Sequence, residues 1–334
     1  MDQENEGIIF KVIKLKADKN NKNTGTNNPK LDQLIETYRS EVPNFYDTGI
    51  SEIFYAPVKD GEIKVFHYKP EKQTSKRPII FLPGFGTTPL TWRDFHIAHH
   101  GQNEYYYVET RDKKSANIRR YRKTDLTINQ LSKDIAEVID FLGFTNQDYV
   151  LMGACLSGGV ILQGIIQNHL SPPTSILFDP FTKWTQNRIF VKGCMPFIPP
   201  FLLGFLKFII ARIVMSNMKN EAQKERNMDI VASAVPWKWR KFSLKNVNFD
   251  LTDDLKKIRN EVFVCHGPKD KYHPEGTFRK VTKNIPKGKF LYMKTLDEDR
   301  QLLVGLIASE FAKITKKDSM PKSLQPFHVK LKKE

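Results

Sequence analysis

Short apolar runs recur along the chain and alternate with stretches whose apolar positions have helical spacing. The runs have the length of buried strands and lie at residues 51–57, 62–68, 78–82, 105–108, 149–152, 175–178, 262–265 and 290–293. The clearest helical stretch extends from Thr127, a residue suited to an N-cap, to Phe141. The turn Lys59-Asp60-Gly61 separates the first two runs and predicts a hairpin. The later alternation predicts an α/β fold, with a mostly parallel central sheet and helices on both faces.

This alternation is interrupted between Phe181 and Lys257, and the interruption divides the chain. The segment is apolar, aromatic and punctuated by proline, which predicts an inserted helical lid. We expect an N-terminal extension and linker at 1–50, a core in two parts at 51–180 and 259–315, the lid at 181–258, and a basic tail at 316–334.

The lid contains one strongly apolar stretch, from Gly193 to Met215. Three prolines and two cations interrupt it, whereas a membrane-spanning helix needs about 20 apolar residues with few central charges. We interpret the stretch as a lid helix that is buried or faces the substrate. A helix resting on a membrane surface is the alternative.

Charge is the most unusual feature of the composition. The 334 residues contain 53 Lys and Arg against 37 Asp and Glu, a net charge of +16. Such an excess first suggests nucleic acid or an anionic membrane as a partner. Most of it lies in three short segments, 11–22, 111–123 and 316–334, which we place outside the expected cleft. No nucleic-acid-binding module accompanies them, so nucleic acid is not the best interpretation.

The cysteines and the N-terminus indicate where the protein resides. The cysteines, Cys155, Cys194 and Cys265, are scattered and form no CxxC pair, which excludes a disulfide framework or a zinc ribbon. The first six residues are acidic where a signal peptide is basic. We expect a cytoplasmic protein, with peripheral membrane contact as the alternative. No cofactor or metal is predicted, because the chain has no P-loop, no H-E-x-x-H and no G-x-G-x-x-G after a strand.

The most informative stretch is Gly153-Ala154-Cys155-Leu156-Ser157, between an apolar strand and a Gly-rich helix start. A strand, a sharp turn and a helix are the context of a nucleophile elbow. With the leading hairpin and the insertion, residues 51–315 resemble the α/β-hydrolase superfamily. The resemblance implies that Cys155 is the nucleophile. A shifted register would make it Ser157. With a cysteine at this position, the elbow is similar to that of the dienelactone hydrolases and the polyhydroxyalkanoate synthases.

The same resemblance implies the other catalytic groups. The loop Leu82–Thr88 is in the position of the oxyanion loop, which assigns the oxyanion donors to the backbone amides of Phe85 and Leu156. The triad acid is expected at Asp270, after Cys265-His266-Gly267, and Asp179 is the second candidate. We interpret His266 itself as a structural residue at the strand end.

The triad base is missing from its expected position, the loop after the last strand. Residues 294–300 contain no histidine, and a carboxylate there would disfavour a thiolate. His273, three residues after Asp270, is one candidate for the missing base. The pair His99-His100 and the tail residue His328 are more distant ones.

Two functions therefore stay open from the sequence. One is a hydrolase or acyltransferase that uses Cys155 on the ester or thioester of a hydrophobic acyl group. The other is a catalytically inactive protein of the same fold, a pseudoenzyme that keeps the pocket to bind a hydrophobic ligand. The expected partner in both is a hydrophobic small molecule.

Overall fold

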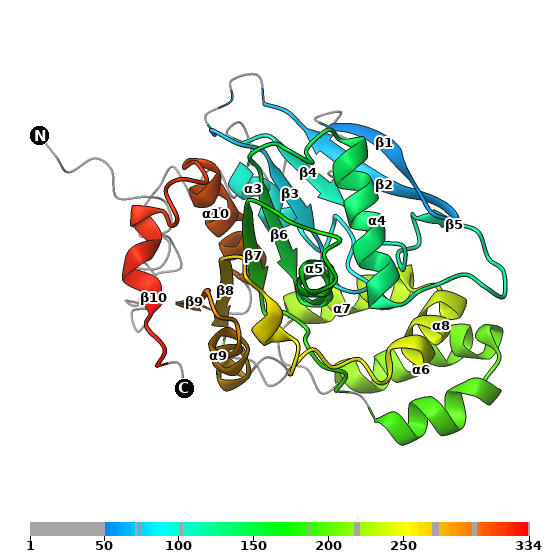
Figure 1. Cartoon of the computed structure of the whole chain (residues 1–334). Helices are drawn as coiled ribbons and strands as arrows, with labels where there is room; N and C mark the ends of the chain where they lie inside the picture. The colour runs from blue at the N-terminus through cyan, green and yellow to red at the C-terminus, as the bar shows by residue number, and fades with distance from the viewer. Residues whose placement is uncertain are drawn as a thin grey trace, which may run out of the picture.

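A twisted central sheet forms the middle layer of the molecule, and helices cover both of its faces (Figure 1). The computed structural model describes residues 51–332 apart from 71–72, 74, 100–102, 186, 217–220, 269–273 and 296–298. The strands are β1 (Ser51–Val58), β2 (Gly61–Tyr68), β3 (Ile79–Leu82), β4 (Tyr105–Val108), β5 (Asn117–Ile118), β6 (Val150–Ala154), β7 (Thr174–Phe178), β8 (Val262–Pro268), β9 (Gly288–Thr295) and β10 (His328–Val329).

The sheet has the order β1-β2-β4-β3-β6-β7-β8-β9-β10, and β5 pairs with β2 off this path. All neighbours from β4 to β9 are parallel, whereas β1–β2, β2–β4, β2–β5 and β9–β10 are antiparallel. The chain leaves β3 to one side for β4 and later returns to its other side as β6. Ligands of open α/β sheets bind where the strand order reverses in this way, beyond the carboxyl ends of the strands.

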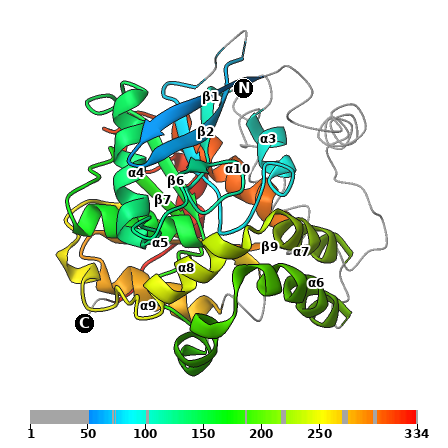
Figure 2. The same cartoon turned by 90° about the vertical axis from the view of Figure 1, so that its right-hand side faces the viewer.

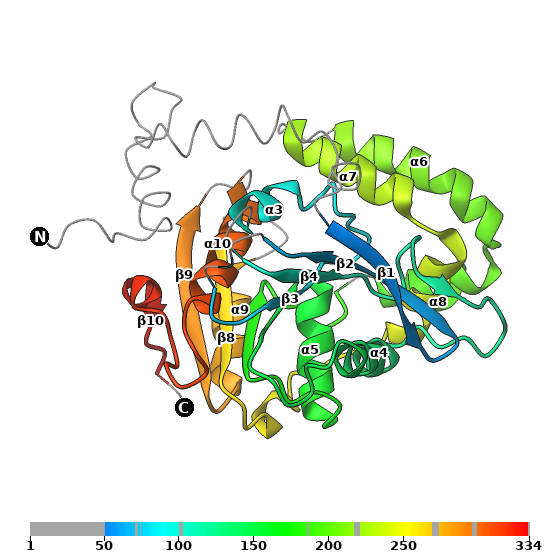
Figure 3. The same ribbon diagram turned by 90° about the horizontal axis from the view of Figure 1, so that it is seen from above.

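The helices are α3 (Arg93–His99), α4 (Ile128–Phe141), α5 (Leu156–Ile166), α6 (Pro200–Ser216), α7 (Glu221–Ser233), α8 (Pro236–Asn246), α9 (Glu275–Asn284) and α10 (Arg300–Ala312). Side chains of α4, α5 and α9 pack on one face of the sheet, and side chains of α3 and α10 pack on the other. Figure 3 shows α3 across the sheet from α4 and α5. This arrangement confirms the predicted fold class.

The regular elements follow from local signals in the sequence. All residues of β6 and β7 are buried, as expected for parallel strands covered on both faces. The predicted N-cap of α4 is confirmed, because the Thr127 hydroxyl accepts a hydrogen bond from the amide of Gln130 (3.2 Å). The tail differs from the prediction. It adds β10 to the sheet edge, where Val329 pairs with Phe290.

The insertion between β7 and β8 gathers at one end of the molecule, where α6 lies beside both α7 and α8 (Figure 2). Short helical turns at Phe190–Cys194 and Met195–Phe197 precede α6. We expected the apolar stretch to be buried or to face the substrate. Much of it is exposed instead, with Phe201 80% accessible, because only one side of α6 packs against neighbouring helices.

A helix that crosses a membrane must be both long and apolar. Among the described residues no single helix meets both requirements. Phe190–Phe197 and Pro200–Ile209 meet them only as a pair, with a bend of 119° between them.

Candidate active site

Cys155 lies at the turn between β6 and α5, at the carboxyl edge of the sheet. Its backbone has φ 49° and ψ −113°, a conformation that non-glycine residues rarely adopt. The Cys155 amide donates to the carbonyl of Phe178 (2.9 Å), which ties the turn to the neighbouring strand β7. Strained turns of this kind lift one side chain above the sheet. The half-buried Cys155 thiol is therefore in the position of a nucleophile.

Small residues make this turn sterically possible. A Cβ atom on Gly159 would lie 2.0 Å from the carbonyl oxygen of Phe181. A Cβ atom on Gly153 would lie 2.7 Å from the side chain of Ile161. Glycine is the residue that permits both close approaches, so the Gly-rich sequence around Cys155 follows from packing as well as from chemistry.

The alternative nucleophile Ser157 has a different environment. It lies in the first turn of α5 with no exposed surface, and its hydroxyl donates to the carbonyl of Pro83 (2.5 Å). This bond attaches the start of α5 to the loop after β3. We retain Cys155 as the candidate nucleophile.

The proposed oxyanion donors flank Cys155 on two elements. Leu156 is the first residue of α5, where backbone amides have no partner within the helix. Phe85 is in the loop after β3, and a Cβ on its neighbour Gly84 would lie 3.6 Å from Cys155 Cβ. Neither amide donates a hydrogen bond to any residue in the described part of the chain. Both are therefore available to a ligand oxygen above the turn.

The loop that carries Phe85 is held in place by polar contacts. The Thr87 hydroxyl donates to the carbonyl of Gly84 (2.7 Å) and accepts from Trp92 Nε1 (3.0 Å). The Phe85 ring contacts Trp239 and Phe242 of α8 at centroid distances of 5.4 and 5.0 Å. The oxyanion loop is thus packed directly against the helical insertion.

A buried carboxylate–imidazole pair lies beside the elbow. His266 Nδ1 is 2.6 Å from Asp179 Oδ1, and both side chains are almost inaccessible. The pairing of β6, β7 and β8 places Cys155, Asp179 and His266 at the same level on three adjacent strands. The backbones of Cys155 and His266 are therefore separated by about 10 Å, two strand spacings.

Arg300 completes this group from the opposite side. Its Nη2 atom lies 2.9 Å from Asp179 Oδ2, so the carboxylate is shared between an imidazole and a guanidinium. Arg300 begins α10, directly after the loop in which the resemblance places the triad base. No hydrogen bond to the Cys155 sulfur is made by any residue whose position the structure describes. The predicted residues Asp270 and His273 lie outside the described residues.

A buried lysine on the other side of the elbow was not predicted. Lys113 Nζ donates to the carbonyl of Gly84, and only 5% of the residue is accessible. Burial lowers the pKa of Lys113, and interactions with Asp112, Glu109 and the Cys155 thiol oppose this shift. We placed the basic segment 111–123 outside the expected cleft, and for Lys113 this was wrong. The segment follows β4, and parallel strands bring their carboxyl ends to one edge of the sheet.

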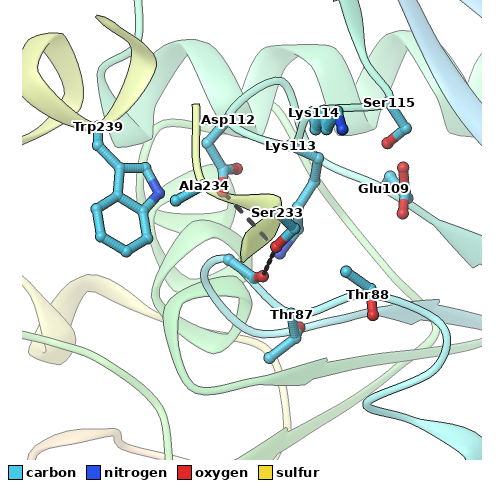
Figure 4. Close-up of a pocket in the computed structure, with 11 residues that line it drawn as sticks. Thr87, Thr88, Glu109, Asp112, Lys113, Lys114, Ser115, Ser233, Ala234 and Trp239 are labelled. Carbon is cyan, nitrogen blue, oxygen red and sulfur yellow. Dashed lines mark hydrogen bonds and ion pairs between the residues drawn. The ribbon is translucent and has the colours of Figure 1, made fainter. Parts of the chain in front are cut away.

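Lys113 lines a cavity of about 350 Å³ above the oxyanion loop (Figure 4). The floor is Gly86, Thr87 and Thr88, and the insertion supplies Ser233, Ala234 and Trp239. Figure 4 shows the charged side chains on one side of this cavity and the indole of Trp239 on the other. This cavity, which Cys155 itself does not line, thus has one polar and one apolar wall. A signal for this was present in the sequence, since Glu109-Thr110-Arg111-Asp112-Lys113 directly follows a strand of the parallel sheet.

Glu109 is another buried titratable residue of this wall. Its Oε2 atom is buried without a hydrogen-bond partner, and burial raises the pKa of the Glu109 carboxyl to about 7. Interactions with Lys113 and Lys64 lower the pKa by a smaller amount. The protonated carboxyl is therefore the form that folding favours.

This shift predicts a pH dependence of stability. Folding raises the pKa of Glu109, so its stabilising contribution is present at acidic pH and is lost as pH rises through about 7. Relative to Glu109→Gln, we expect the wild type to lose on the order of 3 kcal/mol of unfolding free energy between about pH 4 and pH 8. Urea unfolding of both proteins across this range measures the difference. Parallel curves would show that Glu109 does not titrate in the folded state.

Comparisons with known proteins assign the architecture. No protein-family model and no curated protein sequence matches the chain. Among solved structures, a hydrolase from Pseudomonas aeruginosa PA01 has a TM-score of 0.59 at 12% identity, over 79% of this chain and 98% of that one. An esterase from Exiguobacterium antarcticum has a TM-score of 0.58 at 19% identity, over 76% of this chain and 97% of that one. This chain has the α/β-hydrolase fold.

The likeness extends to a bacterial membrane phospholipase A, with a TM-score of 0.53 at 12% identity, over 78% of this chain and 84% of that one. At such identities the likeness shows the α/β-hydrolase fold and leaves the activity open.

Within the described residues, no group of three or more His, Cys, Asp or Glu side chains could hold a metal ion.

Proposed function

We propose that this α/β-hydrolase-fold protein cleaves or transfers the acyl group of a hydrophobic ester or thioester, with Cys155 as its nucleophile. The observation that carries the proposal is the strained backbone of Cys155 at the start of α5, beside two unused amides. The esterases and the phospholipase among the structural neighbours support an ester substrate.

The chemistry of the proposal has two steps. The Cys155 thiolate adds to the acyl carbonyl carbon, and the amides of Phe85 and Leu156 bind the oxygen as it becomes negative. The C–O or C–S bond to the leaving group then breaks, and the departing alcohol or thiol takes up a proton. Water or an acceptor hydroxyl next attacks the acyl-Cys155 thioester, loses its proton, and releases the thiolate.

In this proposal Lys113 places a cationic side chain at the oxyanion loop. Lys113 Nζ donates a hydrogen bond to the carbonyl of Gly84 in the oxyanion loop. From this position the Lys113 ammonium interacts electrostatically with Cys155. Lys113 therefore acts on the nucleophile from the side opposite to Asp179 and His266.

Lys113→Met is expected to slow alkylation of Cys155 by iodoacetamide about tenfold, because it removes the buried cation that is bonded to the carbonyl of Gly84 beside the elbow. The exposed Cys194 would also react, so the measurement uses a Cys194→Ala background. Cys265 is fully buried and does not interfere. Lys114→Met, which removes an exposed charge from the next position, is the matched control. Equal rates for the two variants would remove Lys113 from the mechanism.

The walls of the cavity suggest an amphiphilic substrate. Trp239 and Ala234 offer an apolar surface for an acyl chain, and Lys113 with Glu109 offers polar contacts at the opposite wall. The test is a series of p-nitrophenyl esters and acyl-CoA thioesters of increasing chain length. Turnover that rises with chain length and disappears in Cys155→Ala supports the proposal.

The second candidate function is binding without catalysis. It is favoured by Arg300, which stands where the fold usually has its base and is held in an ion pair with Asp179. Binding of a fluorescent fatty acid by both the wild type and Cys155→Ala, with background turnover in each, would favour this function over the first.

A further inference from the structure

The insertion presents a continuous apolar surface to solvent, which we call the α6 apolar face. It consists of Ile189, Phe190, Phe197, Phe201, Leu202, Phe205, Phe208 and Ile209. Phe197 is 84% accessible, Phe201 80% and Phe205 67%. Phe201, Phe205 and Phe208 have the spacing i, i+4, i+7, which places them on one side of the helix.

A surface of this kind is unfavourable in water. Single exposed apolar residues are common, but a contiguous group of five phenylalanines and three aliphatic residues is typical of an interaction site. The opposite side of α6 explains why the exposed side is available. There Ala211 is buried, and Lys207 Nζ donates to the carbonyl of Ala234 (3.0 Å). The inner side of α6 thus already packs against the rest of the insertion, and the α6 apolar face is left exposed.

The segment that carries the α6 apolar face contains cations and no acidic residue. Residues 188–216 contain four cations, Arg188, Lys192, Lys207 and Arg212, and no acidic residue. Of these, Arg188, Lys192 and Arg212 are exposed. Cations beside an apolar surface complement the anionic headgroups of a bilayer, while the phenylalanines enter the headgroup boundary.

A second basic segment is attached to the same insertion. Lys241 of α8 donates to the carbonyls of Tyr121 (3.1 Å) and Arg122 (2.8 Å), and the Arg120 guanidinium lies 5.6 Å from the ring of Trp237. These contacts fix the exposed cations of residues 119–123 next to α8, which packs beside α6. The basic character of the insertion therefore extends beyond α6.

Polar contacts hold the apolar face in its exposed position. The Arg240 side chain of α8 donates from Nε to the carbonyl of Met195 (2.9 Å) and from Nη2 to that of Pro196 (2.5 Å). These bonds secure the turn that carries Phe197 against α8. The exposed phenylalanines thus project from an anchored support.

We propose that the α6 apolar face docks on the surface of an anionic lipid bilayer, with α6 lying along the membrane interface. The bend of 119° before α6 fits a helix that lies on a surface better than one that crosses it. Docking would bring the helices that wall the cavity to the lipid, where amphiphilic molecules are concentrated. The proposal does not depend on the chemistry of Cys155.

Sedimentation of the full chain with vesicles tests this proposal. We expect binding to vesicles of phosphatidylcholine mixed with phosphatidylglycerol, and at least about tenfold weaker binding for the double variant Phe201→Ser/Phe205→Ser. Phe141→Ser is the matched control, because Phe141 is a 53% exposed phenylalanine on α4. The triple variant Arg188→Gln/Lys192→Gln/Arg212→Gln is expected to reduce binding to the anionic vesicles and to remove its salt dependence. Thermal unfolding confirms that each variant is folded.

Several results would overturn the proposal. The wild type could fail to bind the phosphatidylcholine–phosphatidylglycerol vesicles at low salt, or Phe141→Ser could weaken binding as much as the double variant. Size-exclusion chromatography could show a dimer that the double variant abolishes, in the absence of vesicle binding, and a second copy would then cover the face. Cys155→Ala should bind vesicles like the wild type, which separates this outcome from any failure of the proposed catalysis.

Discussion

Replacing Cys155 by alanine is expected to lower ester or thioester turnover to the background level, a loss on the order of 10⁴-fold or more. The covalent step needs the sulfur, because the neighbouring Ser157 hydroxyl is buried and donates to the carbonyl of Pro83. The fold of the variant should be unchanged, because alanine keeps the Cβ atom and the backbone bond to Phe178 does not involve the side chain. Initial rates on the best ester, with circular dichroism as the check on folding, measure the effect.

Ser157→Ala is the informative companion to this variant. The Ser157 hydroxyl donates a hydrogen bond to the carbonyl of Pro83. Removing this hydroxyl should lower the free energy of unfolding by about 1 kcal/mol and leave most of the turnover. If Ser157→Ala abolishes turnover and Cys155→Ala does not, the nucleophile is Ser157 and the register we assign to the elbow is wrong. Mass spectrometry of an acyl-enzyme trapped with a slow ester identifies the modified residue directly.

Arg111→Met is expected to give the largest loss of stability, about 3–5 kcal/mol. Arg111 is fully buried and forms a bidentate pair with Asp134, which is itself only 1% accessible. Its guanidinium also donates to the carbonyls of Asp125 (2.7 Å) and Lys59 (3.0 Å), so it joins the β1–β2 turn to the start of α4. Removing it leaves a buried carboxylate and two carbonyls without these partners.

Urea unfolding of the wild type and of Arg111→Met measures this effect. Arg119→Met is the control, because Arg119 is exposed in the same segment, and a change within about 0.5 kcal/mol is expected there. A difference between the two variants of less than about 1 kcal/mol would contradict the structural role of Arg111. The double variant Arg111→Met/Asp134→Leu should recover part of the loss, because it removes the uncompensated charge as well.

Most of the regular structure could be predicted from the sequence because its signals are local. The strand at Tyr105–Val108 and the helix that ends at Phe141 have the expected limits. Burial on both faces requires continuous apolar strands, and a cap requires a particular side chain at one position. The strand β10 was missed because two residues of the tail carry no pattern of their own, and their pairing with β9 decides their conformation.

The site was predictable only in part. The elbow at Cys155 and the loop at Phe85 follow from neighbouring residues in the sequence, whereas the pair Asp179–His266 joins residues 87 positions apart. Lys113 could be related to Cys155 only through the strand order, since β3 lies between β4 and β6. Periodicity contains no information on such contacts.

The sequence by itself determined the order of strands and helices, the hairpin, the α/β class with its mostly parallel sheet, and the cysteine at the elbow. These features depend on hydrophobic periodicity, turn residues and glycines that permit close approach, all of which act over a few residues. The tertiary structure alone decided that Lys113 reaches the oxyanion loop, that Arg300 pairs with Asp179, and that the apolar side of α6 faces solvent. Burial and charge pairing depend on which segments meet in space, and only the folded chain specifies that.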